Sequence, residues 1–395
     1  MYVFTVLLIV FIIVSLYGLI EFALHQKRIF SIPIRIHING TRGKSSVTRL
    51  IGAALREAGI KTITKVTGTY PRLILENGCE VAIYRKAEPN IIEQLSIIKF
   101  SSKRKAQAIV MECMAVQPQY QWVTETKMFH STIGVITNVR LDHIDVMGYT
   151  LPEIADALGN TIPKNQNIFT AEKILFNKLK EISDKRNSVI QLAEENQVTE
   201  EEMKGFGYIE HKENVALALA VSQHLGIERN VALRGMYKAI PDAGALKRSI
   251  VNVFQKKISF FNAFAANDPQ STLMIWKKIK AEIGMRGAKI ILLNTRQDRL
   301  DRAKQLTGMI GTELNNEFDY LILIGQSAEV VEELAVAGGV KRNKIVNLGW
   351  TEPEAVFEAV LAYTADQSSV VAIGNMGGMG GKVADFFENR SVVYG

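Results

Sequence analysis

The 395-residue chain contains few cysteines and histidines, two and six respectively. Cys79 and Cys113 are too few for the disulfide framework of a small secreted domain, and no zinc-binding spacing occurs. The sequence therefore indicates a protein of a reducing compartment whose fold depends on its hydrophobic core. Cys113 lies in a strand-like apolar run, where we expect it to pack as a small apolar residue.

Clusters of charge of a single sign are also scarce. The chain has 47 Lys and Arg against 40 Asp and Glu, a net charge of +7. Its basic residues are scattered in short groups such as Lys27-Arg28, and no basic stripe interleaved with aromatic residues occurs. We therefore expect no nucleic-acid partner, and we attribute the excess to anionic substrates or lipid headgroups. The length allows two or three domains.

Charged residues are absent from Tyr2 to Ile20. At about 1.5 Å per helical residue, this run approaches the ~30 Å thickness of a bilayer core. A cleaved signal peptide would need a basic start and a small-residue cleavage site, and neither is present. A buried core helix is the alternative. Because Lys27 and Arg28 follow, we predict a single-pass anchor in the cell membrane with the catalytic domains on the cytoplasmic face.

A glycine-containing segment, Asn39-Gly-Thr-Arg-Gly-Lys-Ser-Ser46, follows the apolar run from Ile34 to Ile38. The two glycines let backbone N–H groups approach phosphate oxygens. Lys44 would neutralise phosphate charge, and the hydroxyl of Ser45 would ligate Mg²⁺. The alternative is a glycine turn that only opens a helix. We predict a nucleotide site formed by Gly40, Thr41, Arg42, Gly43, Lys44, Ser45 and Ser46.

Apolar runs and helical patterns alternate along the chain, which is typical of an α/β fold with mostly parallel sheets. We predict strands at 35–38, 106–111 and 131–138, helices at 45–58 and 214–225, and solvated helix surface over most of 172–204. After a predicted turn at 241–244 the pattern restarts, with strands at 258–261, 289–293, 320–324, 344–347 and 370–373. The expected division is an anchor and juxtamembrane segment at 1–28, a phosphate-loop domain at 29–248 and a smaller Rossmann-like domain at 249–395.

The spacing of the loop, GxxGKS, is two residues shorter than the GxxxxGK[ST] of ordinary P-loop NTPases. It resembles the loop of the Mur ligase superfamily, which includes folylpolyglutamate synthetase. Glu112 ends the apolar run Ala-Ile-Val-Met-Glu, where its carboxylate would bind Mg²⁺ together with Ser45. A capped or ion-paired glutamate is the alternative.

The segment Thr137–Gly148 resembles the asparagine, Asp-His and glycine signature of the superfamily. The resemblance makes His143 a candidate ligand of a second Mg²⁺, and a structural hydrogen-bonding histidine is the alternative. The carbamylated lysine of the superfamily falls at Leu158, which cannot carry a carbamate. The second metal would then be held by His143 with another carboxylate, such as Asp145, or more loosely.

Other segments resemble superfamily motifs less closely. Asn214, in His211-Lys-Glu-Asn214, is a candidate for contacting ATP, with a helix N-terminal hydrogen bond as the alternative. Arg72 follows Thr67-Gly68-Thr69, which resembles a Mur ligase turn, and it is a candidate for an acidic substrate or a solvated arginine. Asn262–Pro269 resembles a loop of the second domain, with Ala266 at the histidine position.

Two further segments of the second domain carry possible anion-binding groups. Arg296 and Arg299 are candidates for holding a substrate α-carboxylate, with a charged helix start as the alternative. The glycine-rich segment from Gly374 to Lys382 looks like a second phosphate loop. Because Val383 follows the lysine where a metal-binding hydroxyl would stand, we expect a strand-to-helix turn there.

Within the superfamily, an anchor followed by NGTRGKSS, ECMAV, DHIDVMG and FAAND resembles the ligase subunits of bacterial poly-γ-glutamate (capsule) synthases. The resemblance implies an ATP-dependent acid–amino-acid ligase that adds glutamate to a growing poly-γ-glutamate chain through an acyl phosphate. It implies catalytic roles for Lys44, Glu112 and His143, ATP and Mg²⁺ as cofactors, and small integral-membrane synthase or export subunits as partners. The alternatives are a ligase for another acceptor, such as a folate or a cell-wall precursor, and a membrane-tethered P-loop NTPase acting as a motor or regulator.

Overall fold

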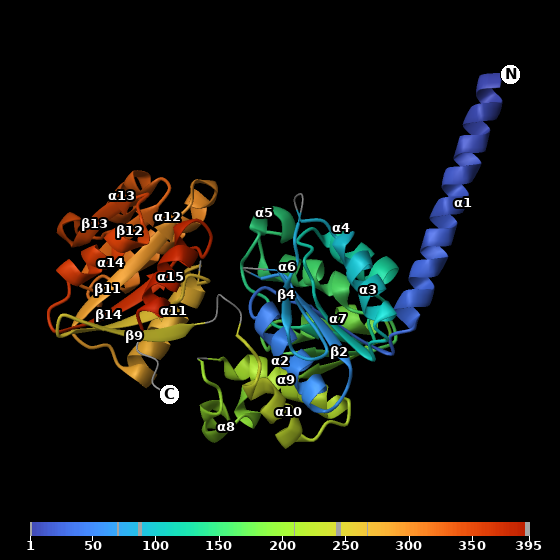
Figure 1. The fold of residues 1–395 in the computed structure, drawn as a ribbon, viewed down its shortest axis with the longest axis horizontal. Coiled ribbons are helices and arrows are strands. Elements are labelled where there is room, and N and C mark those ends of the chain that lie inside the picture. Colours follow the sequence, from blue (N-terminus) through green and yellow to red (C-terminus); the bar gives the residue numbers. More distant parts are fainter. Residues whose placement is uncertain are drawn as a thin grey trace. The chain divides into compact units, whose positions relative to one another are not determined.

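The computed structural model describes residues 2–68, 71–85, 89–208, 210–241, 246–266 and 268–391. The chain forms two compact units, Met1–Asp242 and Ala243–Gly395, each built on its own β-sheet (Figure 1). The predicted boundary between residues 248 and 249 falls inside strand β9 (Lys247–Val253). Most of the predicted turn at 241–244 lies outside the described residues, as does Thr69.

Helix α1 (Tyr2–Phe30) is, among the described residues, the one helix long and apolar enough to cross a membrane. Its apolar side chains are exposed over most of its length. Its last turn contains Lys27 and Arg28 and packs against the first unit, where Ile29 is fully buried and His25 Nε2 lies 2.7 Å from the carbonyl oxygen of Met128. The helix therefore continues beyond the predicted segment and joins the first unit without a break.

The first unit contains an eight-stranded sheet in the order β4-β3-β2-β5-β1-β6-β7-β8. The strands from β2 to β8 in this order run parallel, while β3 and β4 extend the sheet in antiparallel fashion. The bounds are β1 Ile34–Asn39, β2 Thr62–Val66, β3 Arg72–Ile74, β4 Glu80–Ala82, β5 Ala108–Glu112, β6 Ile133–Ile136, β7 Asn167–Thr170 and β8 Val189–Leu192. Because the parallel strands share a direction, the loops after β2, β5, β1, β6 and β7 lie along one edge.

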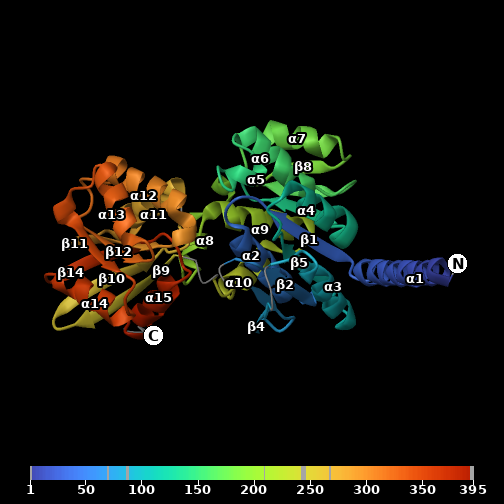
Figure 2. The ribbon, with the colours of Figure 1, turned by 90° about the horizontal axis from the view of Figure 1, so that it is seen from above.

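Helices cover both faces of this sheet (Figure 2). The period of two along β5 shows how: Val110 packs in the cluster under α2 and α9, while Ile109 and Met111 pack in the cluster with α3 on the other face. Near β6 and β7, α6 and α7 form a third cluster. The helix bounds are α2 Lys44–Glu57, α3 Glu93–Lys103, α4 Pro118–Val123, α5 Ile144–Met147, α6 Leu151–Leu158, α7 Phe176–Asp184, α8 Glu200–Lys204, α9 Lys212–His224 and α10 Arg229–Tyr237.

The second unit contains a six-stranded sheet in the order β13-β12-β11-β14-β10-β9, with β9 antiparallel to β10 and the rest parallel. The remaining strands are β10 Lys256–Asn262, β11 Ala288–Thr295, β12 Tyr320–Gly325, β13 Ile345–Gly349 and β14 Gln367–Ile373. The helices are α11 Pro269–Lys278, α12 Leu300–Glu313, α13 Ala328–Ala337, α14 Pro353–Ala362 and α15 Met379–Asn389. Phe260 of β10 stacks on Phe387 of α15 at 4.2 Å between ring centroids.

The α/β class and the positions of the predicted strands are confirmed. The prediction of solvated helix surface over 172–204 is wrong in two places. β8 crosses this segment as an edge strand, and Glu172 is only 2% exposed. The strand was missed because its apolar run, Val-Ile-Gln-Leu, is only four residues long and lies between charge-rich segments.

Candidate active site

The loop between β1 and α2 requires glycine at two positions. Gly40 and Gly43 have φ angles of 129° and 81°, which L-amino acids with a side chain rarely adopt. A Cβ atom at residue 40 would lie 2.0 Å from Thr137 Oγ1, and one at residue 43 would lie 2.6 Å from Asn214 Oδ1. The loop backbone therefore approaches its neighbours more closely than any larger residue permits.

Residues after β6 hold this loop in place. The N–H of Thr41 donates to the carbonyl oxygen of Asn138 at 3.0 Å, and the N–H of Arg42 donates to Asn138 Oδ1 at 3.0 Å. The hydroxyl of Thr137 donates to the carbonyl oxygen of Arg42 at 2.6 Å. These bonds join the two segments that the sequence singled out, and they give Thr137 and Asn138 a loop-bracing role that the motif alone did not reveal.

Lys44, Ser45 and Glu112 converge from α2 and β5. Lys44 Nζ donates to the carbonyl oxygens of Gly40 at 2.6 Å and Thr41 at 3.1 Å. Burial lowers the pKa of Lys44, and the nearby charge of Glu112 opposes this shift. Ser45 Oγ donates to Glu112 Oε2 at 2.9 Å. The strand-end position predicted for Glu112 is confirmed, because β5 ends at this residue.

The pair Ser45 and Glu112 fits a divalent cation by the chemistry of its donors. A hydroxyl oxygen and a carboxylate oxygen lie within hydrogen-bond distance, and both are the hard ligands that Mg²⁺ and Mn²⁺ prefer. The N–H of Thr67, after β2, also donates to Glu112 Oε2, at 2.6 Å, and fixes the carboxylate. Within the described part of the chain, no group of three or more His, Cys, Asp or Glu side chains gathers for a metal. A metal here would complete its shell with substrate phosphate and water.

His143 lies on the same edge of the sheet but in a different setting. Its backbone is left-handed, with φ 47°, and its N–H donates to Asp142 Oδ1 at 3.1 Å. Asp142 Oδ2 lies 3.4 Å from Arg42 Nη2, which ties this segment to the phosphate loop. The metal-binding role of His143 stays a prediction. Leu158, at the position of the superfamily's lysine, is fully buried in an apolar cluster.

Glu172 is a site residue that the sequence reasoning missed. It follows β7 and accepts hydrogen bonds from the N–H of Val139 at 2.8 Å and from Arg140 Nη1 at 3.0 Å. Its other oxygen accepts from the N–H of Ile174 at 2.9 Å. Glu172 thus fixes the segment after β6 that braces the phosphate loop. Its place directly after an apolar run, the same as that of Glu112, is the signal that could have identified it.

Asn214 contacts the phosphate loop from the first turn of α9. It is 6% exposed, and its Nδ2 donates to Glu210 Oε1 at 2.8 Å. Its Oδ1 is the atom that excludes a side chain at Gly43. The structure therefore places Asn214 beside the loop, and the predicted contact with the adenine base stays a prediction.

The three candidate substrate arginines belong to different units: Arg72 lies in the first unit with the phosphate loop, and Arg296 and Arg299 lie in the second. Arg72 begins β3 and is half-buried in the first unit. Arg296 belongs to the second unit, where its Nε and Nη2 donate to Asp298 at 2.9 and 2.8 Å. Arg299 Nε lies 3.7 Å from the same carboxylate. Arg296 and Arg299 therefore both face the carboxylate of Asp298, and their substrate roles stay predictions.

Two families of known proteins match this chain. The Mur ligase middle domain matches residues 38–240, and the poly-gamma-glutamate synthase CapB C-terminal domain matches residues 249–390. The capsule biosynthesis protein CapB of Bacillus anthracis is 38% identical over 380 residues, 95% of this chain and 81% of that protein. PGA synthase CapB of Bacillus subtilis (strain 168) is 38% identical over 369 residues, 93% of both chains.

Solved structures show the same fold at lower identity. FolC of E. coli has a TM-score of 0.70 at 14% identity, covering 94% of this chain and 93% of that chain. A bifunctional folylpolyglutamate synthase/dihydrofolate synthase from Yersinia pestis has a TM-score of 0.70 at 14% identity, covering 93% and 92%. The two family matches together extend over both units, and the Mur ligase match includes the phosphate loop. The chain therefore belongs to the CapB family within the Mur ligases, and it is an ATP-dependent ligase that forms amide bonds.

Proposed function

We propose that this chain polymerises glutamate into poly-γ-glutamate through an acyl phosphate. The observation that carries the proposal is the convergence of Lys44, Ser45 and Glu112 on a loop that admits no larger residue at Gly40 or Gly43. The names of its relatives, a capsule biosynthesis protein and a PGA synthase, support glutamate as the monomer. In the proposed reaction, the terminal carboxylate of the growing poly-γ-glutamate attacks the γ-phosphate of ATP to form an acyl phosphate. The amine of an incoming glutamate then displaces phosphate from it.

The difficulty of the first step is the repulsion between the carboxylate and the phosphate. Two unit charges about 4 Å apart repel by ~4 kcal/mol at an effective dielectric constant near 20, and the γ-phosphate carries more than one charge. Lys44 supplies a cation at the loop. If its ammonium donated to a phosphate oxygen instead of the carbonyl oxygen of Gly40, it would lie beside the negative charge that develops in the reaction. The backbone N–H groups at the start of α2 would bind the phosphates.

ATP and a divalent metal ion are the proposed cofactors, and Mg²⁺ is the proposed ion. The Yersinia pestis structure is of a complex with AMPPNP and Mn, which supports both groups for this fold. Ser45 and Glu112 would hold the metal, which when bound neutralises phosphate charge and polarises the phosphorus. His143 is the proposed ligand of a second ion, and Asn214 the proposed contact to the nucleotide base.

Membrane anchoring by α1 is part of the proposal. Lys27 and Arg28 at its last turn favour the cytoplasmic side for both units. Small integral-membrane synthase and export subunits are the proposed partners, because synthesis beside an exit keeps a long polyanion out of the cytoplasm. A protease added to sealed inside-out vesicles should digest both units; full protection of the units would contradict this orientation.

Glutamate-dependent ATP cleavage tests the proposed reaction. Membranes that contain this protein and its partners should release ADP and phosphate only when glutamate is present. Alanine and aspartate serve as controls for the amino-acid substrate. ATP cleavage that is indifferent to glutamate would contradict the proposal and would favour a motor or regulatory NTPase.

A further inference from the structure

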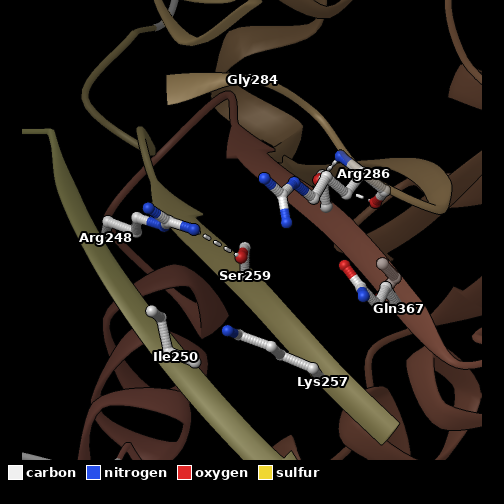
Figure 3. Close-up of a pocket in the computed structure, with 9 residues that line it drawn as sticks. Arg248, Ile250, Lys257, Ser259, Gly284, Arg286 and Gln367 are labelled. Atoms are coloured by element: carbon white, nitrogen blue, oxygen red, sulfur yellow. Dashed lines mark hydrogen bonds between the residues drawn. The ribbon is translucent and has the colours of Figure 1, made fainter. Parts of the chain in front are cut away.

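A basic hollow of about 290 Å³ lies on the sheet of the second unit. Its polar lining comes from three strands and from the segment before β11, as Figure 3 shows. The side chains that matter here are Arg248, Lys257, Ser259, Arg286, Gln367 and Ser369. Gln367 begins β14 and Lys257 is the second residue of β10, so the hollow lies at the amino-terminal half of both strands, away from the loops at the carboxyl ends.

The strand register builds this hollow. Lys257 pairs with Gln367, and Ser259 pairs with Ser369, and directly paired residues share one face of a sheet. The opposite face of β10 is apolar, because Phe260 packs there against α15. Ser369 is 2% exposed, and its hydroxyl accepts a hydrogen bond from the N–H of Arg286 at 3.0 Å. A buried serine therefore fixes the segment that brings Arg286 to the hollow.

Three positively charged side chains line the hollow. Within the part of the chain that the structure describes, no ion pair forms with Arg248, Lys257 or Arg286. Arg248 Nη2 donates to Ser259 Oγ at 3.1 Å, and Figure 3 shows the guanidinium groups of Arg248 and Arg286 reaching over the sheet toward each other. Partial burial of the guanidinium and the charge of Arg286 lower the pKa of Arg248. An anion between these groups would relieve their mutual repulsion.

The arrangement suits an extended anion more than a small one. Arg248, Lys257 and Arg286 are all exposed, so the hollow is open to solvent. Lys257 and Ser259 lie two residues apart on β10, so their Cα atoms are about 6.6 Å apart along the strand. The guanidinium of Arg248 is placed at the second of these positions by its hydrogen bond to Ser259. A polymer with one carboxylate on each residue can contact both Lys257 and the guanidinium of Arg248 at once. A single phosphate bound at one of these two cations leaves the other without an anion.

We propose that this hollow binds the carboxylates of a γ-linked glutamate chain, at a site separate from the phosphate loop. The identity of the polymer rests on the proposed function, since γ-linkage leaves one α-carboxylate free on every residue. The guanidinium groups of Arg248 and Arg286 offer paired donors to a carboxylate, and Lys257 adds a point charge. Ser259 and Gln367 supply neutral hydrogen-bonding groups between them.

Binding of a fluorescent γ-linked oligomer of about ten glutamates to the full chain in detergent tests this proposal. The double variant Arg248→Gln/Lys257→Gln should bind the oligomer about tenfold more weakly at low salt. Its matched control is Lys304→Gln/Lys341→Gln, which removes the same charge from exposed positions of the same unit and should bind as the wild type does. Should the double variant fail to fold, Lys257→Gln alone, at an exposed side chain, should still weaken binding measurably.

The outcomes separate this proposal from the proposed function. Equal weakening in the hollow variant and its control would overturn the proposal, as would displacement of the oligomer by inorganic phosphate at equal anion concentration. Retained glutamate-dependent ATP cleavage on a short acceptor in the hollow variant, with oligomer binding lost, supports both proposals. Oligomer binding that depends on the hollow, in a protein whose ATP cleavage ignores glutamate, would refute the proposed function and support the binding site.

Discussion

The chain contains two strand–glycine–helix turns with a lysine, one in each unit, and they are built differently. In the first, α2 begins directly at Lys44, whose ammonium lies over the loop carbonyls, and Ser45 contacts Glu112 of the neighbouring strand. In the second, α15 begins at Met379, so Lys382 lies inside the helix and is followed by the fully buried Val383.

The interior of each turn also differs. Asn294 Nδ2 donates to the carbonyl oxygens of Asn375 and Gly377, at 2.5 and 2.9 Å, so a side chain of the protein bonds the second turn from within. Met376 and Met379 are buried beneath it. Glycines alone therefore do not make a phosphate site. The lysine must stand at the first helical position, with a hydroxyl next to it and a carboxylate opposite.

The largest contrast is expected between the two lysines. Lys44→Ala should lower glutamate-dependent ATP cleavage by a factor on the order of 10³, because it removes the cation at the transferred phosphate. Lys382→Ala should change it by less than about twofold, since surface substitutions rarely disturb a site. Steady-state ADP release from the purified variants measures both. Similar losses in the two variants would contradict the distinction between the turns.

The residues opposite each turn give the second contrast. Glu112→Gln should lower kcat by about 10²-fold and raise the divalent-ion concentration needed for activity, because a metal-binding charge is lost. Asn294→Ala should leave the metal dependence unchanged and destabilise the second unit by about 1–3 kcal/mol, since two carbonyl groups lose their donor. Metal titrations of activity and denaturant unfolding separate these effects; an unchanged metal requirement in Glu112→Gln would count against the metal assignment.

Local sequence was enough to predict much of the first turn. The apolar run before Gly40, the two glycines and the Lys-Ser pair all lie within the twelve residues 34–45, and β1 and α2 form where that pattern indicates. The residues that contact the loop come from distant segments: Asn138 and Asn214 reach it only through the sheet order and the packing of α9, and Glu172 acts on it through the segment after β6. Such long-range contacts depend on register, which a single sequence does not reveal.

The same limit applied to the second unit. The charge-rich segment after β11 suggested substrate-binding arginines, but the sequence could not show that Asp298 accepts both donors of Arg296. The basic hollow was also not predicted, because Arg248 and Lys257 meet only through the pairing of β9 with β10, and Arg286 reaches them through the hydrogen bond of its N–H to Ser369 of β14.

Glycine-to-alanine substitutions give a third, smaller contrast. Gly43→Ala and Gly374→Ala both place a side chain at positive φ, 81° and 104°, and both should destabilise their own unit by about 1–3 kcal/mol. Only Gly43→Ala should weaken ATP binding, because the added Cβ would push Asn214 away from the turn that is proposed to bind the phosphates. Thermal unfolding and binding of a fluorescent ATP analogue measure the two effects. Equal loss of ATP binding in both variants would place the nucleotide at the second turn as well.

The last contrast concerns the strands that lead into the turns. Burial alone would lower the pKa of His37 on β1, but hydrogen bonds with Cys113 and Glu125, the latter at 2.7 Å, raise it to about 9. A raised folded-state pKa stabilises the first unit fully below the unfolded value of 6.5, and this stabilisation is lost as pH rises through about 9. β14, with the sequence QSSVVAI, has no titratable group.

Denaturant unfolding at pH 6 and pH 10 checks this difference. Between pH 6 and pH 10, the free energy of unfolding of the first unit should fall by on the order of 2–3 kcal/mol more in the wild type than in His37→Gln, because that variant lacks the titrating imidazole. The transition of the second unit should not change with the substitution. A pH dependence of the first unit that is the same with and without His37 would show that the pair with Glu125 does not contribute.

Transfer of ¹⁸O from substrate to phosphate is the most direct test of the central claim, that the first turn activates a carboxylate as an acyl phosphate. An acceptor labelled in its terminal carboxylate is incubated with ATP, glutamate and the membrane-bound protein. The account predicts that each amide bond releases one phosphate carrying one oxygen from that carboxylate, and that Lys44→Ala releases this labelled phosphate on the order of 10³-fold more slowly. Phosphate that takes its new oxygen only from water would contradict the account.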